Sequence, residues 1–253
     1  METQKKSQVV LSDRMQAIVN LVTPGRTVAD VGCDHGFISI YLIEQGIAPR
    51  VIAMDVNDGP LLRAKEHVEE KGLENKITIK KSDGLKNLEW IYNGILEAGC
   101  VIIAGMGGRL TVKILEDSME KLPYLKELIL EPQSDLPMVR RFLWKHGFVM
   151  MKEDMVEEDD KYYQIMKAVR RENIGYEDPY SEYLVSDTLA AKYGPVLLSE
   201  SHPIMRAYLL REKNKYTEII AGMKENGLTD ENEQVIKVNE ELKLIDKALL
   251  FFK

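Results

Sequence analysis

The stretch Thr27-Val-Ala-Asp-Val-Gly-Cys-Asp-His-Gly36 decides the fold of this chain. Its first five residues predict a short buried strand, and Gly32 and Gly36 allow a tight turn into a helix. The glycines are spaced G-x-x-x-G, whereas loops that bind the pyrophosphate of a dinucleotide carry G-x-G-x-x-G. We therefore expect either a plain strand-to-helix turn or a site for a nucleotide-like ligand without a pyrophosphate, in which Asp30 or Asp34 holds an ammonium group.

Outward from this unit, short β-rich runs alternate with amphipathic helical stretches as far as residue 170, which is typical of a parallel sheet. Strands are expected at 27–31, 50–55, 76–80, 100–104, 127–130, 148–156 and 162–169, and helices at 36–45, 60–71, 109–121 and 136–146. Only an acidic loop separates the last two strands, so they should form an antiparallel hairpin. An α/β, Rossmann-like sheet of seven strands with the last one antiparallel is the pattern of class I methyltransferases.

A different pattern begins after about residue 175. Apolar residues recur at alternating steps of three and four, which predicts a coiled-coil seam: Val235, Val238, Leu242, Ile245, Leu249 and Phe252. Asn226-Gly227 should end the preceding helix, and Asp230 with Glu233 makes a capping box for the next. We expect an antiparallel helical hairpin, with dimerisation through the same seam as the alternative. The predicted domains are residues 1–172, a cofactor-binding methyltransferase domain, and residues 173–253, a helical domain.

Acidic residues follow two further strands at the edge where the glycine turn lies. Asp55 ends the second strand, about twenty residues after the glycines, where an acid can accept hydrogen bonds from both ribose hydroxyls of an adenosine. Val56 and Asn57 follow it and can touch the same nucleoside. Asp83-Gly84 follows the third strand, where the carboxylate can receive an adenine amino group. Acids at the carboxyl ends of consecutive parallel strands predict a nucleoside site.

The fourth strand ends in Ala104-Gly-Met-Gly-Gly-Arg109. Many amino-group DNA methyltransferases carry Asp/Asn-Pro-Pro-aromatic at this point, whereas here Gly107 and Gly108 would leave room for a planar ring and Met106 could pack on it. A ring nitrogen with an in-plane lone pair needs alignment with a methyl donor more than it needs a base. A glycine-rich cap of the next helix is the alternative interpretation.

Several segments resemble the bacterial tRNA adenine-N1 methyltransferases that act on position 22 of tRNA. They are LSDR (11–14), VADVGCDHGFISIYL (28–42), MDVNDGP (54–60), SDGL (82–85), IIAGMGG (102–108), EEDDKYYQIM (157–166) and YGPVLLSESHP (193–203). The resemblance implies that the first domain binds S-adenosylmethionine and that the coiled-coil-like second domain helps to engage tRNA.

Carried onto matching positions, the resemblance also implies roles for single residues. The cofactor site would be lined by Arg14, Asp34, His35, Asp55, Asn57, Asp83, Gly84 and Gly105, and the target base would be bordered by Gly107 and Gly108. The segment LILEPQSD (128–135) resembles the Gln-Pro-Asn stretch of the family, but Glu131 stands where the family carries Gln. His35 could take part in proton transfer, bind the methionine carboxylate, or only fix the loop.

The bulk composition sets the remaining expectations. The net charge of −7 argues against a protein that coats nucleic acid, although it does not exclude a local basic face. No apolar run is long enough for a membrane helix, and the two cysteines show no metal-binding pattern, so we expect a cytoplasmic monomer with no metal. The alternatives are a methyltransferase for another RNA or a small molecule, or a non-catalytic RNA-binding protein that keeps the cofactor site.

Overall fold

The computed structural model describes residues 8–91, 94–173 and 188–252. The chain divides into two compact units, residues 1–181 and 182–253. This division falls within residues 174–187, which lie outside the described part, so the boundary expected at 172/173 stays a prediction.

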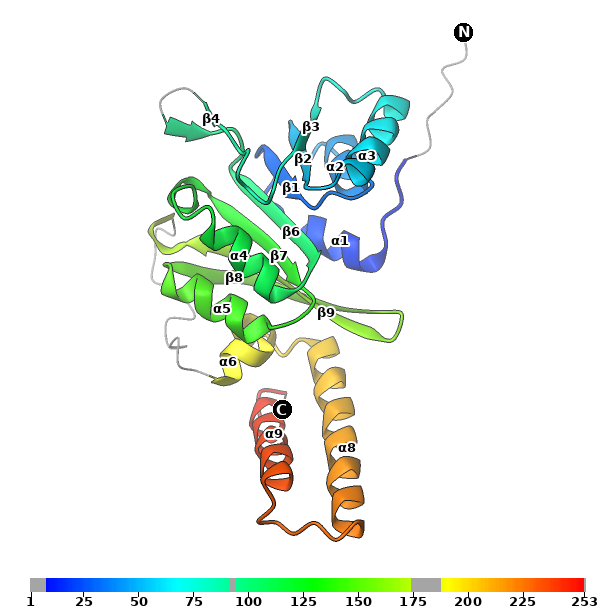
Figure 1. The fold of residues 1–253 in the computed structure, drawn as a ribbon, viewed down its shortest axis with the longest axis vertical. Helices are drawn as coiled ribbons and strands as arrows, with labels where there is room; N and C mark the ends of the chain where they lie inside the picture. Colours follow the sequence, from blue (N-terminus) through cyan, green and yellow to red (C-terminus); the bar gives the residue numbers. More distant parts are fainter. Residues whose placement is uncertain (1–7, 92–93, 174–187, 253) are drawn as a thin grey trace. The chain divides into compact units, whose positions relative to one another are not determined.

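The first unit is built on a seven-stranded sheet in the order β3-β2-β1-β6-β7-β9-β8 (Figure 1). Five neighbouring strands pair in parallel: β1 (Val28–Val31), β2 (Val51–Asp55), β3 (Ile77–Lys81), β6 (Cys100–Met106) and β7 (Glu127–Pro132). β9 (Lys161–Arg170) runs antiparallel between β7 and β8 (Phe148–Glu158). The predicted strands and the reversed last strand are confirmed.

Helices cover both faces of this sheet. They are α1 (Asp13–Asn20), α2 (Phe37–Glu44), α3 (Asp58–Lys71), α4 (Gly108–Glu116) and α5 (Leu136–Lys145), with short 3-10 turns η2 (Leu122–Tyr124) and η3 (Arg171–Asn173). One hydrophobic cluster joins apolar residues of α1, α2 and α3 with alternate residues of the strands, such as Val51 and Ala53. Figure 1 shows α4 and α5 in front of the sheet. The central strands β1, β2 and β7 are therefore buried throughout, as their largely apolar sequences predict, whereas the edge strand β3 is mostly uncovered.

Two elements of this unit were not expected from the sequence. The first is α1, whose N-cap Ser12 accepts a hydrogen bond from the backbone N–H of Met15. The second is a small hairpin of β4 (Trp90–Ile91) and β5 (Ile95–Leu96). In addition, α4 ends at Glu116, five residues earlier than expected, and a turn leads from it into η2 around Pro123.

The turn between β1 and α2 depends on its two glycines. Gly32 and Gly36 have φ angles of 75° and 73°, in the left-handed region that favours glycine. A Cβ at Gly36 would lie 3.2 Å from the Cβ of Ala64, so α3 packs directly against the turn. The start of α2 is thereby fixed at the carboxyl end of β1.

The second unit consists of α6 (Thr188–Tyr193), α7 (Pro195–Ser199), α8 (Pro203–Glu225) and α9 (Glu233–Leu249). The helices α8 and α9 pack side by side as an antiparallel hairpin (Figure 1). The predicted seam is the covered face of α9, with Val235 and Ile245 fully buried. Lys213 and Asp246 form an ion pair of 2.7 Å across the hairpin. The expected hairpin is confirmed.

The expected cap of α9 is wrong. Asn232 is the N-cap, and its side-chain oxygen accepts a hydrogen bond of 2.9 Å from the backbone N–H of Gln234. Asp230 instead lies 2.9 Å from the Lys224 ammonium group. A turn closed by the Asn232 N–H and the Thr229 carbonyl delays the helix start, so Asp230 is too far from the first free N–H groups to cap them.

Candidate functional site

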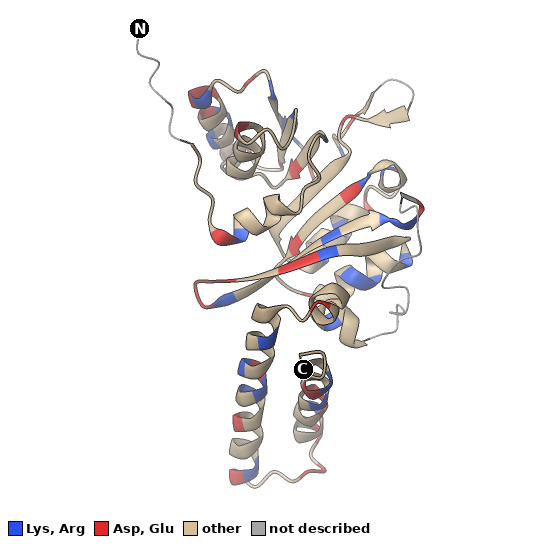
Figure 2. Cartoon of the chain, turned by 180° about the vertical axis from the view of Figure 1, so that it is seen from behind, with Lys and Arg blue, Asp and Glu red and all other residues tan. Residues whose placement is uncertain are grey.

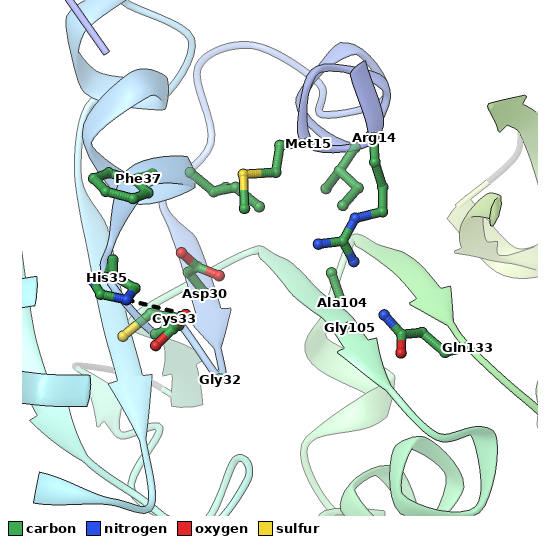
Figure 3. Close-up of a pocket in the computed structure, with 13 residues that line it drawn as sticks. Arg14, Met15, Asp30, Gly32, Cys33, His35, Phe37, Ala104, Gly105 and Gln133 are labelled. Atoms are coloured by element: carbon green, nitrogen blue, oxygen red, sulfur yellow. Dashed lines mark ion pairs between the residues drawn. The ribbon is translucent and has the colours of Figure 1, made fainter. Parts of the chain in front are cut away.

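A cavity of about 250 Å³ opens at the carboxyl ends of β1 and β6 (Figure 3). Its walls come from α1, the β1–α2 turn, the end of β6 and the residue that follows β7. Six of the residues expected at the site line this cavity: Arg14, Asp30, Gly32, Asp34, His35 and Gly105. Segments up to about 120 residues apart in the sequence are therefore brought together at one edge of the sheet, as the acidic strand ends predicted.

The other expected cofactor residues lie beside this cavity rather than in its lining. Asp55 ends β2, next to β1, and is only 9% exposed. Its carboxylate accepts a 2.9 Å hydrogen bond from the backbone N–H of Asn57, so the strand end and the start of α3 are held together. Val56 is exposed. A hydrogen bond from the Ser82 N–H to the Asp55 carbonyl places the end of β3 alongside.

The turn that follows β3 carries Asp83 and Gly84. Asp83 is exposed and forms an ion pair with Lys86, which holds the pKa of the Asp83 carboxyl below its usual range. The φ angle of Gly84 is 60°, and a Cβ there would lie 2.9 Å from Ile114. Gly84 thus has a packing reason to be glycine, and its contact with a ligand stays a prediction.

Asp30 is the buried acid of the cavity. It is 3% exposed, and one carboxylate oxygen accepts a hydrogen bond of 2.6 Å from the Ser39 hydroxyl group. Burial, with a smaller contribution from the nearby Asp55, raises the pKa of Asp30 to about 6. A cation bound against this carboxylate would relieve the cost of its buried charge.

Asp34, the alternative acid, has a different environment. Its side chain is 65% exposed and lies 3.5 Å from the Arg63 guanidinium group and 3.7 Å from His35 Nε2. Of the two acids, Asp30 is the better placed to hold an ammonium group, because water screens the charge of Asp34.

The wall of the cavity opposite Asp30 is held together by the buried carboxylate of Glu131, whose role could not be assigned from the sequence. Glu131 Oε2 accepts hydrogen bonds from the Gly105 N–H at 2.8 Å and from Arg14 Nη1 at 3.1 Å. The Glu131 side chain is fully buried, and burial raises the pKa of its carboxyl although both donors oppose this. Arg14 also packs over the ring of Tyr163, and its backbone N–H donates to Glu158 at 3.0 Å. Arg14 and the turn at Gly105 are thereby fixed to β7.

Gly105 leaves open space in this wall because it has no side chain. Its φ angle is 73°, and a Cβ at this position would meet only Arg14 Nη1 at 3.7 Å and Gln133 Nε2 at 4.0 Å. Gln133 lines the cavity but was not expected there, because it lies in the bend that follows β7. The apolar lining residues Met15, Ile18 and Phe37 were also missed, because nothing in their local sequence distinguishes them from core residues.

The remaining residues of the glycine-rich segment do not line the cavity. Gly108 N–H donates to the Ser134 carbonyl at 3.1 Å, and a Cβ at Gly108 would lie only 2.3 Å from that oxygen. Gly108 therefore has a packing reason to be glycine that is independent of any base. Gly107 is less constrained, since its Cβ would lie 3.3 Å from the Ser134 hydroxyl oxygen. The methyl group of Met106 lies against Gly32, so its predicted contact with a base is untested.

His35 lies at the rim of the cavity in a stack of three rings. Its ring is 5.5 Å from that of Phe37 and 5.8 Å from that of His67, and His67 Nδ1 lies 2.9 Å from the His35 carbonyl oxygen. These contacts fix the loop, and they leave a catalytic role for His35 as a prediction only. Within the described residues, no group of three or more ligating side chains is close enough to hold a metal ion. In the same residues, no helix is long and apolar enough to cross a membrane.

The comparisons with known proteins agree with this geometry. A family model described as a methyltransferase domain matches residues 11–166. The tRNA (adenine(22)-N(1))-methyltransferase of Bacillus subtilis (strain 168) is 31% identical over 231 residues, which cover 91% of this chain and 93% of the relative.

Two solved structures are similar over nearly the whole chain. The B. subtilis tRNA methyltransferase has a TM-score of 0.80 at 28% identity, covering 95% of this chain and 99% of that one. The Streptococcus pneumoniae protein Sp1610, in complex with S-adenosyl-L-methionine, has a TM-score of 0.78 at 28% identity, covering 95% and 100%. The domain match, the relative's identity and the shared fold lead to one conclusion: this chain belongs to the methyltransferase-domain family and, within it, to the tRNA (adenine(22)-N(1))-methyltransferases.

Proposed function

We propose that this chain transfers a methyl group from S-adenosylmethionine to N1 of adenine 22 in tRNA. The observation that carries the proposal is the cavity between Asp30 and Gly105. On one side it has acidic residues suited to the cofactor, and on the other it has open space at Gly105 for a planar base. The named activity of the B. subtilis relative supports the same assignment.

The residues present fit S-adenosylmethionine. Asp30 would hold its ammonium group, and Asp55 would accept hydrogen bonds from its ribose hydroxyls. Asp83 would receive the adenine amino group of the cofactor. When bound, the cofactor supplies a sulfonium methyl group, which the lone pair of adenine N1 attacks as the carbon–sulfur bond breaks.

The chain's own residues then have a positioning task. Adenine N1 is unprotonated near neutral pH and carries its lone pair in the ring plane, so no base has to remove a proton from it. The fixed Gly105 turn and the Arg14–Glu131 pair provide a rigid wall, and alignment of two reactants is worth roughly 7–11 kcal/mol in well-oriented reactions. The target adenine, once bound in the cavity, would also exclude water from this wall.

The tRNA would be bound in part by basic residues of α8, which Figure 2 shows along that helix in blue. They are Arg206, Arg211, Lys213, Lys215 and Lys224. We also propose that the protein acts as a monomer in the cytoplasm, where its tRNA substrate is found, and that the target base is flipped out of its helix to reach the cavity. Another substrate, or a role without catalysis, has less support, because the alignment with the B. subtilis tRNA methyltransferase spans almost the full length of both chains.

Product analysis tests this function. Unmodified tRNA is incubated with the protein and S-adenosylmethionine, digested to nucleosides and separated under conditions that prevent base-catalysed rearrangement. We expect 1-methyladenosine, lost when adenine 22 is replaced by guanine. N6-methyladenosine as the first product, or methylation that survives the replacement, would contradict the proposal.

A further inference from the structure

Gln133 is held at the cavity wall by its backbone. It follows the last residue of β7, Pro132, and its N–H donates to the Met106 carbonyl at 2.8 Å, which ties the ends of β6 and β7 together. Its side chain extends into the cavity beside Gly105 and the Arg14 guanidinium group (Figure 3). The backbone of Gln133 is therefore fixed by two neighbouring strands, and its exposed side chain projects from this fixed point.

The amide of Gln133 is uncommitted, whereas each charged side chain around the cavity has at least one partner. Arg14 is paired with Glu131, and Asp30 accepts from Ser39. Asp34 is placed near Arg63. Among the described residues, the Gln133 amide makes no hydrogen bond, so both its donor and its acceptor are available to a ligand. Polar groups that converge on a cavity in this way fix the orientation of what binds there.

An amide matches one edge of adenine that leaves the reacting atom free. Adenine presents the N7 acceptor and the N6 amino donor side by side, and glutamine pairs with both at once. N1 lies on the other side of the amino group and takes no part in this pairing. Guanine presents two acceptors, O6 and N7, on the same edge, so the amide oxygen would face another oxygen.

We propose that Gln133 selects adenine by donating from Nε2 to N7 and accepting from N6 at Oε1, which turns N1 toward the methyl donor. The inference rests on the proposed function and names the group that reads its target base. It also gives a reason for methylation at N1: the N6 amino group is held as a donor, and its nitrogen lone pair stays conjugated with the ring.

The test combines a protein change with an atomic change in the base. In 7-deazaadenine a C–H group replaces N7, so the acceptor for Nε2 is removed while N1 and N6 remain. We expect the wild-type protein to methylate tRNA with adenine 22 about tenfold better, by kcat/KM, than tRNA with 7-deazaadenine 22, as one hydrogen bond of a bidentate pair is lost. In Gln133→Glu a carboxylate faces the N7 lone pair, and 7-deazaadenine relieves this repulsion. That variant should therefore prefer the 7-deazaadenine tRNA.

The matched control is Gln45→Glu, which makes the same change at an exposed position after α2. It should keep the wild-type preference for adenine. Gln133→Ala, which adds no charge, should methylate both tRNAs equally and decides the matter if Gln133→Glu fails to fold. The affinity for S-adenosylhomocysteine is measured for each variant as well, so that a change in cofactor binding is separated from the preference between the two tRNAs. The affinities of the S-adenosylhomocysteine complexes for the two tRNAs should follow the same order as kcat/KM.

A preference for adenine of the same size in wild type, Gln133→Ala and Gln133→Glu would overturn the inference, since Gln133 would then not touch N7. This result differs from failure of the proposed function, in which the wild-type protein would form no 1-methyladenosine at position 22.

Discussion

At the scale of single residues, we expect Asp30 to couple cofactor binding to pH. Burial raises the pKa of this carboxyl to about 6, so the free protein carries it protonated below that pH. An ammonium group bound against it favours the charged form, and binding below pH 6 must then release a proton. The affinity for S-adenosylhomocysteine should rise by up to about tenfold per pH unit from pH 5 to 6 and level off above about 6.5.

Calorimetric titrations between pH 5 and 7.5 measure this slope. Asp30→Asn keeps the shape of the side chain but cannot titrate, so its affinity should be lower at neutral pH and flat with pH. Asp34→Asn is the control: it removes an exposed carboxylate from the same turn and should keep the slope. A flat profile in the wild-type protein would exclude Asp30 as the ammonium partner.

Asp55 makes a second prediction at this scale. It is nearly buried, and one of its oxygens already accepts from the Asn57 N–H. Two ribose hydroxyl groups would lose a charged acceptor in Asp55→Ala, at about 1.5–3 kcal/mol for each bond. The affinity for S-adenosylhomocysteine should fall at least tenfold in calorimetric titration, whereas Asp58→Ala, one turn away and exposed, should change it little. Unchanged binding in Asp55→Ala would remove the residue from the site.

At the scale of elements, the segment after β6 is shaped by its contact with the segment after β7. A methyl group at Gly108 would lie 2.3 Å from the Ser134 carbonyl, which is backbone and cannot turn away. The corresponding contact at Gly107 is 3.3 Å from a hydroxyl group, which can rotate. Gly108→Ala should therefore lower the unfolding free energy by about 1–3 kcal/mol, and Gly107→Ala by much less. Thermal and denaturant unfolding of the two variants give the comparison, and equal stabilities would show that β6 and β7 can separate without strain.

How far the sequence predicts these elements depends on the length and regularity of each pattern. The central strands of the sheet are buried and read as largely apolar runs, and the longer strands β8 and β9 flank an acidic turn, so the order of these strands along the chain could be predicted. The strands β4 and β5 have two residues each, too short for a periodicity to emerge. The acidic strand ends were placed correctly because parallel topology alone brings them to one edge.

The opposite wall of the site could not be predicted in the same way. Glu131 could be named as a departure from the family, but its pairing with Arg14 depends on where α1 packs. The place of Gln133 depends on an irregularity between β6 and β7 at Ala104 and Met106, which no local pattern announces. Residues whose role arises from packing between distant segments need the structure.

At the scale of the whole molecule, we expect the two units to have separable tasks. Every residue that lines the cavity belongs to the first unit. The chain as a whole is acidic, with a net charge of −7, so binding of tRNA needs a local basic surface, and α8 of the second unit carries five Lys and Arg residues. A chain that ends at residue 181 should therefore bind S-adenosylhomocysteine normally and methylate tRNA far more slowly.

The decisive measurement for this division is the salt dependence of tRNA binding. Each contact between a basic side chain and a phosphate adds close to one to the slope of log affinity against log salt concentration. Arg206→Glu changes an exposed residue on α8 and should reduce that slope by about one, with weaker binding but an unchanged affinity for S-adenosylhomocysteine. Lys76→Glu makes the equivalent change at an exposed position just before β3, at the edge of the sheet away from the cavity, and should leave the slope as it is. If the shortened chain methylates tRNA at the full rate and both charge reversals behave alike, the hairpin stabilises the protein without engaging tRNA.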